Sequence, residues 1–375
     1  MILILSLLGY KTQAVKITNF DYIDIEKEIS DRTEEFYRRV NHEWIGLFND
    51  TTYNYHPLYK ICPFKDNNDM NYYVKVFEEE ESKSSNKRVG IVNMKVSSQQ
   101  IGSSMWNKPI LTAERRNKLF EIINMAIKEN CEILVLQELS VPFQWLETLI
   151  SQCKRHNIAI ITGLEYYHGA DMKAYNCVAT ILPIKTKNFT TATAFLRVKN
   201  YYAPKEVKEL EGRRRCVPKV KKYYHLFHWR RCYFSVYNCF ELANINDRAL
   251  FKSKVDFIVA TEWNPDINYY ADIAGSWVRD VHCYFIQCNT SGYGDSCIMQ
   301  PSKTEESRMV TVKGGINSTV LVDDLNIEKL RDFQFKEHTL QMDDKTFKLT
   351  PPNYKTDDVE VRMKNEQFVK DEGEV

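Results

Sequence analysis

Short apolar segments alternate with amphipathic ones through the middle of this chain, and this alternation restricts the possible folds more than any other feature. Residues 88–94 and 132–137 are apolar runs of strand length, and residues 112–130 between them carry apolar side chains at helical spacing. A second helical segment and a third strand follow at residues 143–156 and 158–162. Strand, helix, strand, helix, strand in this order predicts an α/β fold with its sheet buried under helices.

After residue 162 the alternation is interrupted by two consecutive strands, and it resumes further along the chain. Two strands, residues 175–182 and 191–198, follow each other too closely for a helix to fit between them, which predicts antiparallel pairing. The remaining predicted elements are strands at 232–238, 257–260 and 283–288, helices at 244–252 and 267–281, and short strands near Cys297, Met309 and residues 319–322.

A charged, serine-rich segment predicts a domain boundary. It reads EEEESKSSNK from Glu78 to Lys87, a composition typical of a solvated linker. We therefore predict an N-terminal extension of unclear fold over residues 1–81, a linker at 82–87, one main domain at 88–330, and a C-terminal extension or tail at 331–375.

Composition excludes several classes of protein and predicts a compartment. The chain has 51 Lys and Arg against 50 Asp and Glu, which excludes a protein that works by general attraction to phosphate backbones. Its ten cysteines form no C-x-x-C pair and lie in apolar segments, as expected in a reducing compartment, so we predict a cytoplasmic protein. The apolar run Met1–Gly9 lacks basic residues and is too short to span a bilayer. We predict that it is a buried strand and that the protein has no membrane partner.

Three residues with complementary chemistry each follow a predicted strand. They are Glu138, Lys199 and Cys239. In α/β sheets, ligands bind beyond the carboxyl ends of strands, so side chains at these positions can converge on one pocket. A thiol can act as nucleophile, a carboxylate can move its proton, and a cation can stabilise the thiolate and an oxyanion. The three positions therefore predict a site for covalent catalysis.

The segments around these residues resemble the nitrilase, or carbon–nitrogen hydrolase, superfamily. The matching segments are LVLQELSVP around Glu138, VKNYYAPKE around Lys199 and VYNCFELANINDR around Cys239, followed by VDFIVATEWN, RDVHCYFIQCN and GDSCIMQP. The resemblance covers residues 88–330 in the family's order. It implies a four-layer α-β-β-α sandwich of the nitrilase type, here with an N-terminal extension, that forms a homodimer or a higher oligomer.

The resemblance also implies a role for each matching residue. Glu138 would be the general base, Lys199 the cation that stabilises the oxyanion, and Cys239 the nucleophile. Glu206 matches a second carboxylate that positions the lysine and the substrate.

Three further residues would line the substrate site by the same resemblance. The backbone N–H of Phe240 would add to the oxyanion site, and Trp263 and Asn264 would contact the substrate. The implied substrate is a small amide or nitrile, with the amide favoured, and no cofactor is implied.

Several alternatives stay open at this point. Lys205 and Lys208 compete with Lys199 for the role of the catalytic lysine, and choosing Lys205 would make Glu211 the second carboxylate; we prefer Lys199 because it ends an evident strand. The chain also departs from the family, which usually has Glu-Asn where this sequence has His282 and Cys283.

The predicted activity is hydrolysis of a C–N bond through a thioester intermediate, with two rivals. One is a degenerate hydrolase fold that serves as a binding or assembly module for a nucleic-acid enzyme, and the other is an N-acyltransferase that forms amides. The combination of KNYYAPKE, CFELANI and RDVHC further resembles nitrilase-type domains associated with bacterial defence reverse transcriptases. That narrower resemblance implies a role in antiviral defence.

The densest basic stretch, residues 213–231, also contains aromatic residues. Basic and aromatic residues together suit single-stranded nucleic acid, because bases stack on rings while cations follow the phosphates. This stretch could contact a nucleic acid or a reverse transcriptase partner, although a solvated face is the simpler interpretation. A lid over an anionic substrate is a third possibility. Cys216, His225 and His228 lie in this stretch and Cys232 follows it, but their spacing is not that of paired zinc ligands, so we predict no metal site.

Overall fold

A computed structural model describes residues 55–56, 58–66, 69–77, 84–169, 172–187 and 189–368 of the chain, and the structural statements below concern these residues. All of them belong to one compact unit, Tyr53–Val375. The predicted strand Met1–Gly9 lies outside the described residues. No helix in the described ranges has both the length and the apolar character needed to cross a membrane.

One of two sheets has six strands and contains the first part of the predicted alternation. Its strands β4, β5 and β6 are parallel, whereas β7 and β8 pair antiparallel, as predicted from the short connection between them. In spatial order the strands are β15 (Thr319–Leu325), β4 (Lys87–Asn93), β5 (Ile133–Val135), β6 (Ala159–His168), β7 (Ala174–Lys185) and β8 (Thr190–Val198).

The other sheet has nine strands and contains the second part of the alternation. Strands β10, β11 and β12 at its centre are parallel and fully buried, so their carboxyl ends lie at one edge. In spatial order the strands are β1 (Tyr55–His56), β2 (Tyr59–Asp66), β3 (Asp69–Val76), β9 (His225–Trp229), β10 (Cys232–Asn238), β11 (Phe257–Thr261), β12 (Tyr284–Cys288), β13 (Ser296–Met299) and β14 (Arg308–Val312).

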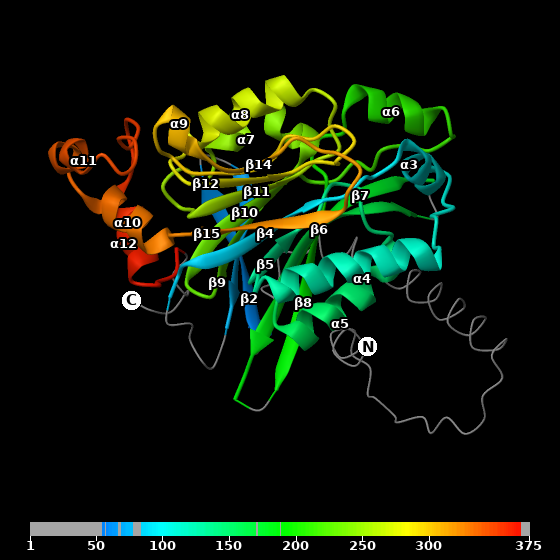
Figure 1. Ribbon diagram of the computed structural model, residues 1–375, viewed down its shortest axis with the longest axis horizontal. Coiled ribbons are helices and arrows are strands. Elements are labelled where there is room, and N and C mark those ends of the chain that lie inside the picture. The colour runs from blue at the N-terminus through cyan, green and yellow to red at the C-terminus, as the bar shows by residue number, and fades with distance from the viewer. Residues whose placement is uncertain are drawn as a thin grey trace. The chain divides into compact units, whose positions relative to one another are not determined.

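Helices cover the outer face of each sheet. Figure 1 shows α4 (Ala113–Lys128) and α5 (Leu146–His156) on the side of the six-stranded sheet, and α7 (Ile245–Ala249) and α8 (Ile267–Asp280) on the side of the nine-stranded sheet. Between these helical layers the sheets face each other, since β12 and β13 contact β4, and β10 contacts β7. The predicted α-β-β-α sandwich is confirmed.

The sequence explains where α4 forms. The side chain of Thr112 accepts a hydrogen bond from the backbone N–H of Arg115 and caps the first turn. Leu119, Ile122 and Ala126 lie at helical spacing and are buried.

The other helical segments are α3 (Ser98–Met105), η1 (Phe143–Trp145), α6 (Pro204–Glu211), η2 (Cys239–Ala243), α9 (Thr304–Ser307), α10 (Ile327–Phe335), α11 (His338–Asp344) and α12 (Thr356–Met363).

Part of the predicted N-terminal extension belongs to the nine-stranded sheet. Strand β3 pairs in parallel with β9, from Tyr72 opposite His225 to Lys75 opposite His228. Tyr73 and Val74 on this strand are fully buried. Strands β1 to β3 therefore extend the sheet that contains β10, the strand directly before Cys239, and they belong to the same compact unit as the main domain.

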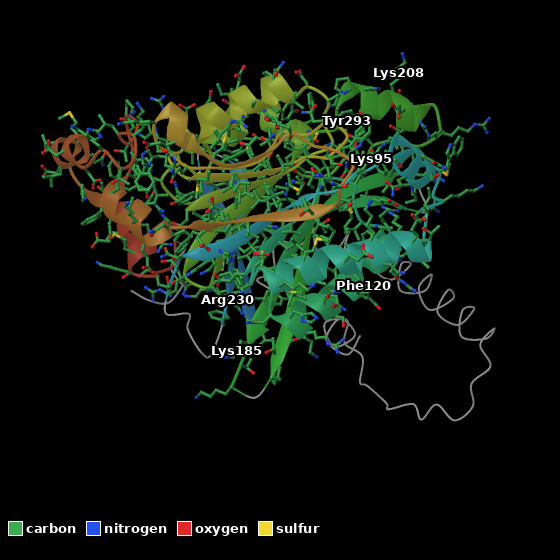
Figure 2. All side chains as sticks on the ribbon, viewed as in Figure 1. Lys95, Phe120, Lys185, Lys208, Arg230 and Tyr293 are labelled. Carbon is green, nitrogen blue, oxygen red and sulfur yellow. The ribbon has the colours of Figure 1, made fainter. Side chains whose placement is uncertain are left out.

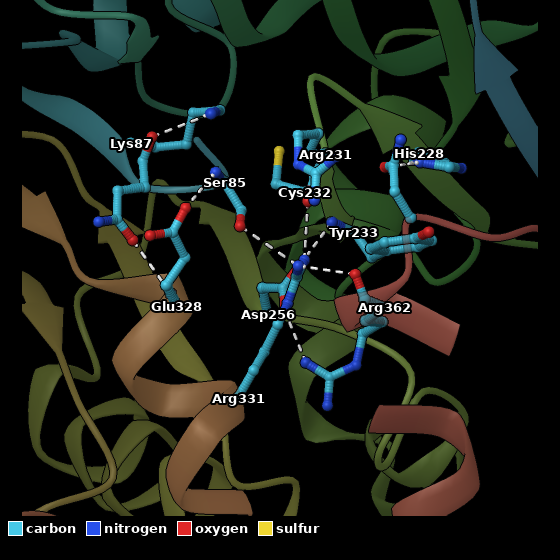
Figure 3. Close-up of polar contacts among 12 residues, drawn as sticks. Ser85, Lys87, His228, Arg231, Cys232, Tyr233, Asp256, Glu328, Arg331 and Arg362 are labelled. Carbon is cyan, nitrogen blue, oxygen red and sulfur yellow. Dashed lines mark hydrogen bonds and ion pairs between the residues drawn. The ribbon is translucent and has the colours of Figure 1, made fainter. Parts of the chain in front are cut away.

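The C-terminal segment differs from the expected tail because it contains helices that are tied to the sheet. Asp256, the residue directly before β11, accepts hydrogen bonds from Arg331 of α10 and from Arg362 of α12, each at 2.6 Å (Figure 3). All three side chains are buried. Burial alone would raise the pKa of Asp256, but the two guanidinium groups outweigh it and lower that pKa. This cluster holds α10 and α12 against the sheet.

Candidate active site

The structure brings together three of the residues that follow predicted strands. The Lys199 ammonium lies 2.7 Å from Oε1 of Glu138 and 2.8 Å from Oε2 of Glu206. Cys239 begins η2 directly after β10 and lies close enough to Lys199 for a thiolate there to act on the ammonium. Glu138, Lys199 and Cys239 are all buried. The four residues predicted to be catalytic therefore form one cluster between the two sheets.

The backbone at Cys239 is in an unusual conformation. Its φ is +49°, in the left-handed region that residues other than glycine seldom adopt. Such strain is often found at functional sites, where the surrounding structure holds it in place. Here the strand ends at Asn238 and the chain turns at once into η2, while the backbone of Trp263 forms a hydrogen bond with the Cys239 sulfur.

The environment of the Cys239 thiol favours its protonated form. Burial and the charge of Glu138 raise the pKa of Cys239 well above its usual value, and the nearby Lys199 ammonium only partly opposes them. The thiol is therefore protonated at neutral pH in the resting protein. Attack on a substrate requires that a neighbouring group take the proton.

The two carboxylates in contact with Lys199 differ in their affinity for a proton. Burial raises the pKa of Glu138, although Lys199 and Asn176 act against the rise. For Glu206, the Lys199 charge and hydrogen bonds from Lys199, Asn176 and Tyr166 outweigh burial, so its pKa is lowered. Both carboxylates together raise the pKa of Lys199 well above its usual value. At neutral pH these shifts favour a cationic Lys199 and an anionic Glu206, and Glu138 is the group suited to exchange protons.

Asn176, inside β7, links the two carboxylates and was not predicted from the sequence. Its Nδ2 donates hydrogen bonds of 2.9 Å to both Glu138 and Glu206. Its Oδ1 accepts a bond from Nδ2 of Asn238, and the Oδ1 of Asn238 accepts one from the Thr261 hydroxyl. This chain of hydrogen bonds runs from the six-stranded to the nine-stranded sheet and fixes the carboxylates relative to the strand end that bears the thiol.

A buried ion pair supports the segments on either side of Lys199 and Cys239. Arg197 makes a two-pronged contact with Glu241, at 2.6 and 2.7 Å. The Glu241 carboxylate also accepts backbone N–H bonds from Asn238 and Asn200. Arg197 lies two positions before Lys199, and Glu241 lies two positions after Cys239. Their ion pair therefore fixes the Lys199 ammonium and the Cys239 thiol relative to each other.

A glycine allows the backbone of Glu138 to approach β6. A Cβ placed on Gly163 would lie 2.5 Å from the Cα of Glu138, closer than any such contact in a relaxed structure. Leu139 then takes a φ of +52°, and Ser140 donates its backbone N–H to the carbonyl of Gly163. A side chain at residue 163 would displace the predicted base.

The two alternative lysines lie outside this cluster. Lys205 and Lys208 are exposed, as is Glu211, whereas Lys199 is buried with the two carboxylates. Geometry thus favours Lys199 over Lys205. Figure 2 shows Lys208 pointing away from the body of the protein on α6.

Two of the predicted substrate-contacting residues, Phe240 and Trp263, lie next to Cys239, and Asn264 follows Trp263 in the chain. Phe240 follows Cys239 and is half-buried, and the half-buried Trp263 donates its Nε1–H to the carbonyl of Val96. Asn264 is buried, and the amide side chain of Asn289 bonds to both its backbone N–H and its carbonyl. Their contacts with a substrate stay predictions.

Aromatic and charged side chains lie at the outer side of this region. The rings of Trp263 and Tyr293 are 5.3 Å apart and edge-on, and exposed Lys95 lies beside Gly292. Tyr293 and Lys95 lie close together near the end of the sandwich that carries α6 (Figure 2). This places them beside the strand ends that meet at the cluster.

The basic segment 213–231 does not present its aromatic rings to solvent. The four large aromatic side chains in it are buried, and β9 is part of the sheet; they are Tyr223, Tyr224, Phe227 and Trp229. They cannot stack on bases in this state, so the predicted nucleic-acid contact rests on the exposed basic residues alone. No group of three or more His, Cys, Asp or Glu side chains in the described ranges is arranged to hold a metal ion.

Comparisons with known proteins find similarity in structure. No family model and no curated protein matches the sequence. A solved structure of XC1258 from Xanthomonas campestris, described as a CN-hydrolase superfamily protein with an arsenic adduct in the active site, is 12% identical, with a TM-score of 0.49 over 71% of this chain and 100% of that one. A mutant of the amidase from Nesterenkonia sp. AN1 in complex with butyramide is also 12% identical, with a TM-score of 0.47 over 68% of this chain and 96% of that one.

Proposed function

We propose that this protein hydrolyses the C–N bond of a small carboxamide through a thioester on Cys239. The observation that carries the proposal is the Lys199 ammonium, buried between the Glu138 and Glu206 carboxylates next to a buried thiol. A buried cation with two anions is costly to maintain. Its position beside the strained Cys239 turn suits an oxyanion that forms on attack by the sulfur.

The proposed reaction has two halves. Glu138 takes the proton of the Cys239 thiol as the sulfur attacks the carbonyl carbon, and the resulting oxyanion faces the Lys199 ammonium. Glu138 then gives the proton to the departing nitrogen, which leaves as ammonia or an amine. In the second half, Glu138 takes a proton from water, the hydroxide attacks the thioester, and the returning proton restores the thiol. Glu206 remains ionised throughout and holds Lys199 in place.

The reactivity of Cys239 tests this proposal without knowledge of the substrate. We expect iodoacetamide to alkylate Cys239 at a rate that falls about tenfold or more in Glu138→Gln, because a general base contributes a factor of this order or larger. Cys216, the exposed cysteine of the described region, serves as an internal control whose rate should not change. Peptide mapping by mass spectrometry gives both rates from one sample. Equal Cys239 rates in the wild type and Glu138→Gln would contradict the proposal.

The same alkylation should depend on pH in a characteristic way. Glu138 must be ionised to accept the proton, and burial raises its pKa. The rate should therefore decrease as the pH is lowered, with a midpoint above the ordinary glutamate pKa of about 4.3. In Glu138→Gln no base remains, and the rate should follow the raised pKa of the thiol itself, so the profile moves to alkaline pH. Profiles with the same midpoint in both proteins would show that Glu138 does not take the proton.

Other outcomes would identify the rival activities. If the thioester is attacked by an added amine rather than water, the product will contain that amine, as expected for an N-acyltransferase. A Cys239 with no dependence on Glu138 would favour a binding module. The homo-oligomer, the reverse transcriptase or nucleic-acid partner and the role in defence stay predictions of the sequence.

A further inference from the structure

Glu262 is a buried carboxyl that the proposed reaction does not use. It follows β11 directly and is fully buried. Neither of its side-chain oxygens has a hydrogen-bond partner among the described residues. Buried polar groups in folded proteins are nearly always paired, so an unpaired carboxyl of this kind needs a specific explanation.

The backbone places Glu262 within the cluster. Asn238 and Thr261 are paired at the ends of two parallel strands, so the next residues, Cys239 and Glu262, are neighbours. The carbonyl of Glu262 accepts the backbone N–H of Glu138 at 3.3 Å. The following residue, Trp263, forms a hydrogen bond with the Cys239 sulfur through its backbone.

The nearby cations are already bound to other carboxylates. Lys199 contacts Glu138 and Glu206, while Asp295, whose charge acts on Glu262, is paired with Arg308 at 3.3 Å and Lys313 at 2.8 Å.

Without a cation, the environment of Glu262 favours its neutral form. Burial and the charges of Glu138 and Asp295 raise the pKa of Glu262 well above its usual value. An ionised carboxylate that is buried without a partner is costly, and such a group neutralises instead. A neutral carboxyl offers one O–H donor and a carbonyl acceptor side by side. This pair of groups complements the C=O and N–H of a carboxamide.

We infer that Glu262 carries its proton and hydrogen-bonds an uncharged amide-like group of the substrate close to the scissile carbon. The inference rests on the proposed function and names its substrate class: compounds with a neutral hydrogen-bonding group, rather than a carboxylate or an ammonium, next to the carbon that Cys239 attacks. A carboxylate there would meet the negative charges of Glu138 and Glu206.

Three small alkylating agents with different charges test this inference. Iodoacetamide carries a neutral amide, iodoacetate an anion and 2-bromoethylamine a cation, and all three alkylate thiols. Their rates at Cys239 are measured by peptide mapping and divided by their rates at exposed Cys216, which cancels their intrinsic reactivity. The variants are Glu262→Gln, which keeps a donor and an acceptor without a charge, and Glu262→Met, which keeps the size but neither hydrogen bond.

We expect iodoacetamide to show the highest normalised rate at Cys239 in the wild type. Glu262→Gln should retain this rate within about threefold, and Glu262→Met should lose about tenfold, because two neutral hydrogen bonds are removed. Iodoacetamide rates that are equal in Glu262→Met and the wild type would overturn the inference. So would a preference for 2-bromoethylamine that disappears in Glu262→Gln, because it would show an ionised Glu262 that binds a cation.

The two proposals fail in different ways. If the proposed function is wrong, the Cys239 rate will not depend on Glu138. If only the inference is wrong, the Cys239 rate will still depend on Glu138, but the iodoacetamide rate will be the same in Glu262→Met as in the wild type, or 2-bromoethylamine will be preferred until Glu262 is replaced by Gln.

Discussion

In the Lys199→Met variant, we expect the rate of amide hydrolysis to fall by about 100- to 1000-fold, the usual cost of removing one group that stabilises an oxyanion. The reason is that the Lys199 ammonium is the cation held by both Glu138 and Glu206, next to the sulfur that attacks. The rate is measured as ammonia release from a short primary amide that the wild type hydrolyses. Lys205→Met is the matched control: this lysine is exposed, lies six residues further along, and should keep the wild-type rate. The reverse result, with Lys205→Met inactive and Lys199→Met active, would contradict the assignment of the lysine.

The same substitution should also destabilise the fold, which provides a check without any substrate. Lys199→Met leaves two carboxylates buried without their cation, and breaking a buried ion pair in this way costs about 3–5 kcal/mol. Adding Glu206→Gln removes one of the uncompensated charges, so the double variant should recover part of the free energy of unfolding. It should not recover hydrolysis, because the cation is still absent.

The second large effect concerns Asp256. We expect Asp256→Asn to lower the free energy of unfolding by about 3–5 kcal/mol, because it leaves the guanidinium groups of Arg331 and Arg362 buried without their shared anion. Denaturation in urea measures the change, and limited proteolysis should show earlier cleavage between α10 and α12. Glu360→Gln, which removes an ion pair with Lys364 on the exposed side of α12, is the control and should cause no measurable change. An equal, small effect of both substitutions would show that the Asp256 cluster does not hold the C-terminal helices.

The Asp256 cluster should also make the fold sensitive to acid. The pKa of Asp256 is lowered in the folded protein, so its stabilising contribution is complete above the unfolded value of about 3.9 and is lost as pH falls through the lower, folded value. In Asp256→Asn this part of the pH dependence should be missing.

Much of the fold could be predicted from the sequence, because the central strands are buried on both faces. Strands β10, β11 and β12 consist almost entirely of apolar residues, which distinguishes them from the helices between them. Cys239 follows β10, whereas Glu138 and Lys199 follow strands of the six-stranded sheet, and the three meet because the two sheets face each other. Buried strands thus leave a clear local pattern.

The remaining features depend on contacts between distant parts of the chain. Asn176 lies inside a strand, where a polar residue normally points to solvent, and only the facing sheet makes it a partner of two carboxylates. Glu262 lies in a segment that resembles the nitrilase superfamily, but nothing in its neighbours along the chain shows that it is unpaired.

Strand β3 was missed for the same reason, since β9, its partner, is about 150 residues away and lies within a basic stretch that gives no strand pattern. The helix α12 was missed because the segment around it is mostly charged, and its anchor is the single buried Arg362.

The most direct test of the account is a rapid-quench experiment on a primary amide that the protein hydrolyses. The reaction is stopped in acid during turnover, and the peptides are mapped by mass spectrometry. We predict an acyl group, with the mass of the substrate minus its amine, on the peptide that contains Cys239, and neither this adduct nor hydrolysis in Cys239→Ala. Hydrolysis that persists in Cys239→Ala, or an acyl group that accumulates on another residue, would contradict the claim that Cys239 is the nucleophile.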